Sequence, residues 1–187
     1  EDSSEIKLNT IAKCYDKLEK PDSALIYRKI IAMQDIENQN NTIALAQNFL
    51  SMEQPDSALT YLCRYTSIDS TDLNINRLKA YAYNQAGLHQ DAIKLYQKIR
   101  QSGDRQASTE YYLGLSYAYT DSLSQAYDCL VRANNLSERK NAYILSQLGV
   151  IGSKIGMIKE SQQDIKDALD LLQPDKQLVI SLYETAA

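Results

Sequence analysis

The chain has 187 residues, with 20 lysines and arginines against 24 aspartates and glutamates, and a net charge of −4. An acidic chain of this kind lacks the clustered basic face that a nucleic-acid-binding surface usually needs. Six glycines and three prolines are too few for a turn-rich all-β protein, and no apolar run approaches the roughly 18 residues of a membrane span. We therefore expect no nucleic-acid partner and no membrane span in this chain.

A period of 34 residues runs through the sequence. The pentapeptide Pro-Asp-Ser-Ala-Leu occurs at 21–25 and again at 55–59. Three columns keep the same period: an alanine column, a small-residue column and an aromatic column. Their members are Ala24, Ala58, Ala92 and Ala126; Ala12, Ala46, Ala80 and Gly114; and Tyr15, Phe49, Tyr83 and Tyr117. Independent columns with one common period indicate a repeat architecture.

Each repeat predicts two helices joined by a short turn. Apolar residues recur at three- and four-residue steps on both sides of a break, which is a proline in the first two repeats and Gly87 in the third. We expect helices over 4–19, 22–35, 39–52, 55–68, 72–86, 89–102, 105–120, 123–135, 139–155, 158–172 and 175–186. The repeat units then cover 5–38, 39–72, 73–106, 107–141 and 142–175, followed by a terminal helix over 175–187, within one domain that spans 1–187.

The small-residue columns predict where the two helices of a pair cross. Helices approach closely only where at least one contacting residue is small, so we expect Ala12 to face Ala24 and Gly114 to face Ala126. The aromatic column is expected to fill the wider gap toward the next pair, because neighbouring pairs must stack to bury a continuous core.

The fifth unit departs from the period by one residue. Gly149 lies 35 residues beyond Gly114, which places the extra residue in the connection between Asn134 and Asn141. Gly152 replaces the aromatic residue of the column. Each glycine lowers helix propensity by about 1 kcal/mol relative to alanine, so we expect the fifth pair to be the most mobile.

These columns resemble those of the tetratricopeptide repeat (TPR) family. The fourth unit carries the resemblance best, in Leu113, Gly114, Tyr117, Ala126, Leu130 and Ala133. The resemblance implies an all-α, right-handed superhelical solenoid of antiparallel helix pairs, with about five pairs plus a terminal helix. The Pro-Asp-Ser-Ala-Leu turns look like those of bacterial TPR proteins of the Bacteroidetes type, which favours an exported or periplasmic location over the cytoplasm.

The chain also departs from the family pattern in two places. The tryptophan that TPR units often carry near the start of the first helix is absent throughout. Arg28 stands in a column whose other members are apolar or aromatic. Those members are Leu62, Tyr96 and Leu130.

The residue patterns of an enzyme are missing from the sequence. His89 is the only histidine and follows a turn between helices, where a solvent-facing side chain is more common than a catalytic base. The sequence has no glycine-rich phosphate loop, no Gly-x-Ser-x-Gly and no His-Glu-x-x-His motif. We therefore predict a protein that is not an enzyme and that needs no cofactor.

Neither the carboxylates nor the cysteines predict a metal site. Asp164, Asp167 and Asp170 share one predicted helix with Lys166, and a solvated helix face explains them better than a cation site. The cysteines are widely spaced without a Cys-x-x-Cys pair, so we expect small half-buried residues rather than a zinc site or a disulfide framework. They are Cys14, Cys63 and Cys129.

Tyrosine is the informative residue type, because 14 tyrosines accompany a single phenylalanine. In a TPR-like stack the first helix of each pair lines a concave groove. Tyrosine gives such a groove a large contact area with a polar tip, and amide side chains can hydrogen-bond a peptide backbone. We predict a partner-binding groove formed by Arg77, Tyr81, Asn84, Gln85, Tyr111, Leu115, Tyr119 and Tyr143. The alternative is that these tyrosines only cover a wide groove or contact the next repeat.

Two functions stay open at this point. The first is a non-catalytic protein–protein interaction scaffold that binds a peptide or protein segment in the Tyr/Asn-rich groove. The second is a sensory or assembly segment of a larger regulator or envelope complex, acting through its ends or its convex face. The start at Glu1 rather than methionine suggests the second function. Self-association is also possible, because the ends of a solenoid expose apolar surface unless they are capped.

Overall fold

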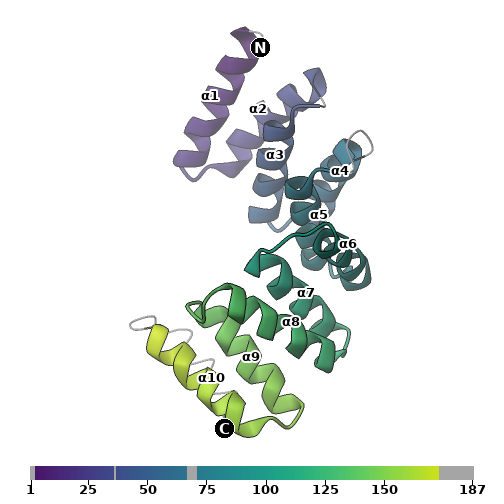
Figure 1. The fold of residues 1–187 in the computed structure, drawn as a ribbon. Coiled ribbons are helices and arrows are strands. Elements are labelled where there is room, and N and C mark those ends of the chain that lie inside the picture. Colours follow the sequence, from purple (N-terminus) through teal and green to yellow (C-terminus); the bar gives the residue numbers. More distant parts are fainter. Residues whose placement is uncertain (1–2, 36, 67–70, 173–187) are drawn as a thin grey trace. The chain divides into compact units, whose positions relative to one another are not determined.

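The computed structural model describes residues 3–35, 37–66 and 71–172, and these residues form ten α-helices and no strand (Figure 1). The helices are α1 (Ser3–Lys17), α2 (Pro21–Gln34), α3 (Gln39–Ser51), α4 (Pro55–Thr66), α5 (Leu73–Gln85), α6 (His89–Gln101), α7 (Ala107–Tyr119), α8 (Leu123–Leu136), α9 (Ala142–Lys154) and α10 (Ile158–Leu171). The chain divides into two compact units, 1–95 and 96–187, and the boundary falls within α6. The predicted all-α class is confirmed.

Within each unit, consecutive helices pack as pairs and the pairs pack on one another. In the first unit α1 packs against α2 and α3 against α4, while α2 contacts α3 and α4 contacts α5. In the second unit α7 packs against α8 and α9 against α10, while α8 contacts α9. The predicted helix-pair repeat is therefore present in both units.

The described helices begin and end within three residues of the predicted positions. The largest difference is at α9, which the sequence predicts from 139 and which begins at Ala142. Glu138 and Arg139 have φ angles of 52° and 57°, which a right-handed helix excludes. Asn141 then caps α9, because its side-chain oxygen accepts hydrogen bonds from two backbone N–H groups of the first turn, at 3.0 and 3.2 Å. The predicted terminal helix over 175–187 lies outside the described residues.

The extra residue of the fifth unit lies where the sequence predicts it. α8 begins 34 residues after α6 but ends 35 residues after it, since α6 covers His89–Gln101 and α8 covers Leu123–Leu136. The following helix α9 is displaced from α7 by 35 residues at both ends. One additional helical residue at the end of α8 therefore accounts for the change of period.

The turn inside each described pair has a left-handed residue at one repeated position. Glu19, Glu53 and Asp121 have φ angles of 54°, 56° and 58°, and Gly87 and Gly156 occupy the same position with 74° and 87°. The next residue in each turn donates its N–H to a carbonyl five positions earlier, at 2.9 to 3.0 Å, which is a common way to end a helix. A left-handed residue other than glycine costs roughly 1–2 kcal/mol, so three of these turns are strained.

The turn column yields a matched pair of stability predictions. Replacing Glu53 with glycine should raise the free energy of unfolding by about 0.5–1 kcal/mol, because glycine relieves the strain but gains freedom in the unfolded chain. Gly87→Ala should lower it by about 1 kcal/mol, and no side-chain clash contributes because nothing lies within 4 Å of an added Cβ. Urea unfolding followed by circular dichroism measures both changes. The same sign for the two variants would contradict this explanation.

Small residues bring the helices of a pair together at their crossing point. Ala12 and Ala24 are completely buried. A Cβ added at Gly114 would lie 3.2 Å from the carbonyl oxygen of Ala126, which confirms the predicted contact between these two positions. The helices of this pair therefore cross at a position where only a small residue fits.

The glycines of α9 make room for large neighbouring side chains. A Cβ at Gly149 would lie 2.5 Å from Cγ1 of Ile165, and a Cβ at Gly152 would lie 2.4 Å from Oγ of Ser161. The ring of Tyr127, from α8, lies 3.2 Å from the same added atom at Gly152. Packing thus accounts for two of the glycines from which the sequence predicts mobility, and the mobility of this pair stays a prediction.

A comparison of two glycines tests this packing. Gly149→Ala should lower the free energy of unfolding by about 1–3 kcal/mol, because the added methyl group meets Ile165 inside contact distance. Gly114→Ala should be close to neutral. Its nearest neighbours are 3.1 to 3.3 Å away, the gain in helix propensity of about 1 kcal/mol offsets the crowding, and alanine occupies this position in the first three pairs. Equal losses in thermal unfolding experiments would show that the two sites are not packed differently.

The aromatic column packs differently from the prediction in the first two pairs. Tyr15 stacks on Tyr27 and Phe49 stacks on Tyr61, with ring centroids 5.7 and 5.6 Å apart. Both stacks lie inside one pair rather than toward the next, because the second helix supplies an aromatic partner 12 residues later. In the fourth pair the partner is missing, and the hydroxyl of Tyr117 accepts a 2.6 Å hydrogen bond from a glutamine of the preceding helix α6.

Candidate functional site

The eight predicted groove residues divide between the two units. Arg77, Tyr81, Asn84 and Gln85 lie on α5 in the first unit, and Tyr111, Leu115 and Tyr119 on α7 with Tyr143 on α9 in the second.

On α5 the predicted residues form a polar surface, and each hydrogen-bonds to a side chain of α5 or of the first residue of α6. Nε2 of Gln85 donates a 2.6 Å hydrogen bond to the hydroxyl of Tyr81, one helical turn earlier. Nδ1 of His89 lies 3.3 Å from Oδ1 of Asn84. His89, the first residue of α6, is half-buried rather than solvent-facing as expected. Its ring contacts Asn84 near the end of α5. The guanidinium of Arg77 donates to the side-chain oxygen of an asparagine on the same helix, at 2.5 Å.

In the second unit, tyrosines surround a cleft of about 320 Å³. Tyr111 and Tyr112 meet edge to face, with ring centroids 5.1 Å apart and an interplanar angle of 66°. Tyr143 lines the cleft from the first turn of α9, and none of the lining side chains is charged. The remaining lining residues are Ala107, Ser108, Asn141 and Ile144. We call this feature the tyrosine cleft.

The structure brings together only part of the predicted set at this cleft. Tyr111 and Tyr143 both line it, whereas Leu115 and Tyr119 do not. Tyr119 is nevertheless 71% exposed and Tyr143 is 55% exposed, so large aromatic surfaces face solvent in this unit. The predicted set lacks Tyr112, because a helix places consecutive residues on different faces and only the tertiary structure shows that both rings reach the cleft. The two consecutive tyrosines at 111 and 112 are the feature of the sequence that could have indicated Tyr112 as a site residue.

Burial, together with the smaller effect of the neighbouring phenols of Tyr112, Tyr119 and Tyr143, raises the pKa of the Tyr111 phenol to about 12. The neighbours act by disfavouring a second negative charge. The hydroxyl of Tyr111 therefore stays protonated at any physiological pH. It can donate a hydrogen bond to a ligand, while its ring supplies apolar surface.

The titration of Tyr111 gives a prediction with a definite sign. Because the folded-state pKa of about 12 lies above the ordinary value of 10.0, the contribution of this group is fully present below pH 10 and is lost as the pH rises through 12. The free energy of unfolding should fall between these values, and it should fall less steeply in Tyr111→Phe. Ultraviolet titration of tyrosinate should show that this variant lacks one phenol that ionises near pH 12 in the wild type. A normal titration of all phenols in the wild type would contradict the burial of Tyr111.

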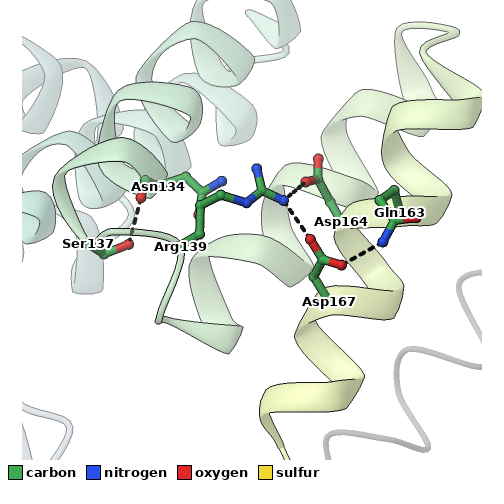
Figure 2. A network of polar contacts seen from close by, with 6 residues as sticks. All are labelled: Asn134, Ser137, Arg139, Gln163, Asp164 and Asp167. Carbon is green, nitrogen blue, oxygen red and sulfur yellow. Dashed lines mark hydrogen bonds and ion pairs between the residues drawn. The ribbon is translucent and has the colours of Figure 1, made fainter.

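Arg139 precedes the residues that form one wall of the tyrosine cleft, and it anchors their loop to α10. Its Nη2 donates hydrogen bonds to Asp164 at 3.1 Å and to Asp167 at 2.7 Å, both on α10 (Figure 2). Gln163 supports Asp167 through a further hydrogen bond of 2.6 Å. Since Asn141 and Tyr143 follow Arg139 closely in the chain, these contacts fix the start of α9 and with it the cleft.

For Asp164 and Asp167 this network corrects the interpretation of the α10 carboxylates as a solvated face, whereas Asp170 is exposed as predicted. Asp164 is only 6% exposed. Burial raises its pKa although Arg139 lowers it, whereas the hydrogen bond from Arg139 lowers the pKa of Asp167. The sequence could not pair these groups, because Arg139 lies 25 residues away from Asp164 in a loop.

Removing Arg139 should leave a buried carboxylate without a partner. We expect Arg139→Ala to lower the free energy of unfolding at pH 7 by about 1–2 kcal/mol. This is less than the loss for a fully buried ion pair, because the arginine is half-exposed and solvent screens its charge. The neighbouring variant Lys140→Ala should change little, since Lys140 and its partner Glu138 are both highly exposed.

The pH dependence of the Arg139→Ala effect follows from the two carboxyls. Asp167, whose folded pKa is lowered, contributes stability above pH 3.8 that is lost as the pH falls through its folded pKa. Asp164, whose folded pKa is raised, contributes stability below pH 3.8 that is lost as the pH rises through its folded pKa. The loss in Arg139→Ala should therefore shrink as Asp164 becomes protonated, and Arg139→Ala/Asp164→Asn should recover much of it at pH 7. An unchanged loss across the acid range in urea unfolding would contradict the ion pairs.

A second buried carboxylate fixes the other wall of the cleft. Glu110, in the first turn of α7, is 6% exposed and accepts a 3.0 Å hydrogen bond from Nε of Arg132, with Arg100 3.6 Å away. Arg132 also donates to Sγ of Cys129 at 3.1 Å. Burial raises the pKa of this thiol, so it stays protonated. The expectation of half-buried cysteines is wrong for all three, because Cys129 is buried and Cys14 and Cys63 are exposed.

Comparisons with known proteins identify the fold. No protein-family model matches the sequence, and no curated protein sequence matches it. Solved structures do match: MamA from residue 41 onward of Desulfovibrio magneticus RS-1 gives a TM-score of 0.83 at 14% identity, covering 94% of this chain and 99% of that one. The fold is TPR-like. TTC0263, described as a thermophilic TPR protein of Thermus thermophilus, gives 0.74 at 18% identity over 97% of this chain and 98% of that one.

A further structure of MamA has a TM-score of 0.77 at 18% identity and covers 87% of this chain and 95% of that one. At such identities the likeness concerns the fold, and the Bacteroidetes-type origin stays a prediction. Among the described residues, no helix has both the length and the apolar character that a bilayer crossing requires.

Proposed function

We propose that this chain is a non-catalytic protein-interaction scaffold that binds a peptide or protein segment, and that the tyrosine cleft holds one large apolar side chain of that segment. The TPR-like fold supports the general role. The specific support is the cleft itself, in which Tyr111, Tyr112 and Tyr143 enclose about 320 Å³ without a charged lining residue.

An uncharged aromatic cleft favours an apolar occupant for two reasons. Transfer of an apolar side chain from water onto aromatic rings gains roughly 25 cal/mol for each Å² that is buried. An ionised side chain would lose its hydration there without finding an opposite charge. The tyrosine hydroxyls and the exposed rings of Tyr119 and Tyr143 can then supply further contacts to the bound segment.

The rigidity of the walls supports the same function. Buried carboxylates hold both of them, Glu110 at the start of α7 and Asp164 through Arg139 at the start of α9. A preformed cleft loses less conformational entropy on binding than a cleft that must order first. The eight predicted groove residues stay part of this proposal as two separate sets. Arg77, Tyr81, Asn84 and Gln85 form the polar set of the first unit, and Tyr111, Leu115, Tyr119 and Tyr143 belong to the second.

Peptide selection followed by affinity measurement tests the cleft. A random linear peptide library is selected on the wild-type chain, and the enriched peptides are titrated against variants. Tyr111→Ala and Tyr143→Ala should each weaken binding by about 10- to 100-fold, as expected for aromatic residues at the centre of an interface. Because Tyr143 is more than half exposed, its replacement should leave the helix content unchanged.

Two matched controls separate ring contacts from other effects. Tyr143→Phe keeps the ring and should retain most of the affinity. Ile158→Ala removes an apolar side chain that is 51% exposed but does not line the cleft, and it should have no effect. Failure to select any peptide, or equal affinities for the wild type and both alanine variants, would contradict the assignment of the cleft.

An apolar stripe on α2 favours the second function, assembly through another face. Ile26, Ile30 and Met33 follow at steps of four and three residues on one side of the helix, and they are 60%, 38% and 81% exposed. Single exposed apolar residues are ordinary, but a stripe is typical of a contact surface. In this alternative the stripe mediates self-association or docking into a larger complex.

Sedimentation analysis distinguishes the two functions. If the stripe mediates self-association, the wild-type chain should dimerise with increasing concentration, and Ile26→Lys/Met33→Lys should stay monomeric. The same variant should keep its peptide affinity if the tyrosine cleft is the binding site. A wild-type chain that is monomeric at all concentrations would contradict self-association through α2.

A further inference from the structure

Arg28 is buried at a position where the other repeats place an apolar or aromatic residue. Its exposed fraction is 3%, compared with 0% for Leu62, 1% for Tyr96 and 0% for Leu130. Each of these residues lies 34 positions after the one before it. The first pair thus has a charged group where the later pairs have part of their core.

Two other polar residues accompany Arg28. Its Nε donates a 2.7 Å hydrogen bond to Oδ1 of Asn48, and its Nη2 donates to the carboxylate of Asp16. Nδ2 of Asn48 donates a 3.0 Å hydrogen bond to the other oxygen of Asp16. These three residues, which we call the Arg28 triad, come from α2, α1 and α3 and close a ring of hydrogen bonds.

The next pair shows what the same positions contain without a triad. The residues 34 positions after Asp16, Arg28 and Asn48 are Leu50, Leu62 and Ala82. Leu62 and Ala82 belong to one buried apolar cluster, and Leu50 packs against it. Within one chain, the same architecture is therefore built once with a polar triad and once with apolar packing.

The triad forms the floor of an open pocket of about 550 Å³. Gln47 and Ser51, on the exposed side of α3, and Glu19, in the turn after α1, complete its polar lining. Stability does not require such a triad, because apolar residues of similar size usually replace a buried ion pair without loss. A buried guanidinium that lines a pocket is instead typical of a binding site.

The charges of the pocket exclude ionic ligands. An anion would meet the carboxylates of Asp16 and Glu19 against the single positive charge of Arg28, which already binds Asp16. A cation would meet the guanidinium of Arg28, and both oxygens of Asp16 already accept hydrogen bonds. A neutral group with a donor and an acceptor avoids both conflicts.

Hydrogen-bonding capacity for such a group remains in the pocket. Within the described part of the chain, no acceptor is bonded to Nη1 of Arg28, and the exposed carboxamide of Gln47 has no hydrogen-bond partner. The guanidinium can donate to a carbonyl oxygen, and the carboxamide of Gln47 can both donate and accept. An amide group fits this combination.

We infer that the pocket over the Arg28 triad binds a neutral amide group, from an asparagine or glutamine side chain or from a peptide bond. This inference rests on the proposed function only in that the amide belongs to a polypeptide. The pocket is formed by residues of the first unit, whereas the tyrosine cleft lies in the second.

Small probes test the chemistry without a known partner. The isotope-labelled full chain is titrated with propionamide, which represents a side-chain amide, and with N-methylacetamide, which represents a peptide bond. Propionate and propylammonium are the ionic controls. At least one amide should shift the NMR signals of the Gln47 carboxamide and the Ser51 backbone amide saturably, with an affinity at least tenfold above those of both ions. The tighter amide identifies the source.

The variant Asp16→Leu/Arg28→Leu/Asn48→Ala gives the first pair the residues of the second. It should melt at the same or a higher temperature and should lose the saturable shifts. If this variant does not fold, Gln47→Ala serves instead, because Gln47 is exposed and outside the triad. It should weaken amide binding several-fold.

Each outcome decides the inference. Saturable binding of an amide that disappears in the variants supports it. No saturable shift, equal or tighter binding of propionate or propylammonium, or binding that survives in the variants would overturn it. Tyr111→Ala should leave amide binding unchanged, so failure of the tyrosine cleft and failure of this pocket are separate results.

Discussion

The close contact between small residues at each helix crossing is the constraint on which the rest of the structure depends. Alanines of both columns are completely buried in the first three pairs, and Gly114 meets the backbone of the facing helix in the fourth. Because this contact fixes the register of one helix against the other, every other column lies at a set distance from it. Stacked rings, buried carboxylates and pockets all occur at positions that this register defines.

Departures from the repeat create both candidate binding features. The tyrosine cleft depends on Glu110 and on the altered α8–α9 connection, where one additional residue and two left-handed residues place Arg139 against α10. The pocket in the first unit depends on Arg28 in an otherwise apolar or aromatic column. The repeat thus supplies a stable framework, while individual substitutions supply polar or aromatic chemistry at chosen points. One feature suits an apolar side chain and the other a neutral amide.

Sequence reasoning predicts what periodic local patterns determine. Helix positions follow from apolar spacing, and the contact of Gly114 with Ala126 follows from the small-residue columns. Contacts between polar residues that are distant in the sequence cannot be predicted in this way, because nothing around Asp164 indicates that Arg139 will contact it. Arg28 stands out as an exception to its column, but its partners Asp16 and Asn48 look like ordinary surface residues. The left-handed turns at Glu19 and Glu53 are also hidden, since glutamate gives no signal for that conformation.

The fit of Tyr127 against Gly152 has a consequence for the history of the chain. A Cβ at Gly152 would lie 2.4 Å from Oγ of Ser161 on the fifth pair and 3.2 Å from the ring of Tyr127 on the fourth, so the serine and the ring together favour glycine there. The fifth pair, with Gly152, fits after the fourth pair, with Tyr127. After a pair with a smaller residue in place of Tyr127 it would leave a void. A pair with an aromatic residue in place of Gly152 would clash with the fourth. Repeats that arose as copies have thus become non-interchangeable.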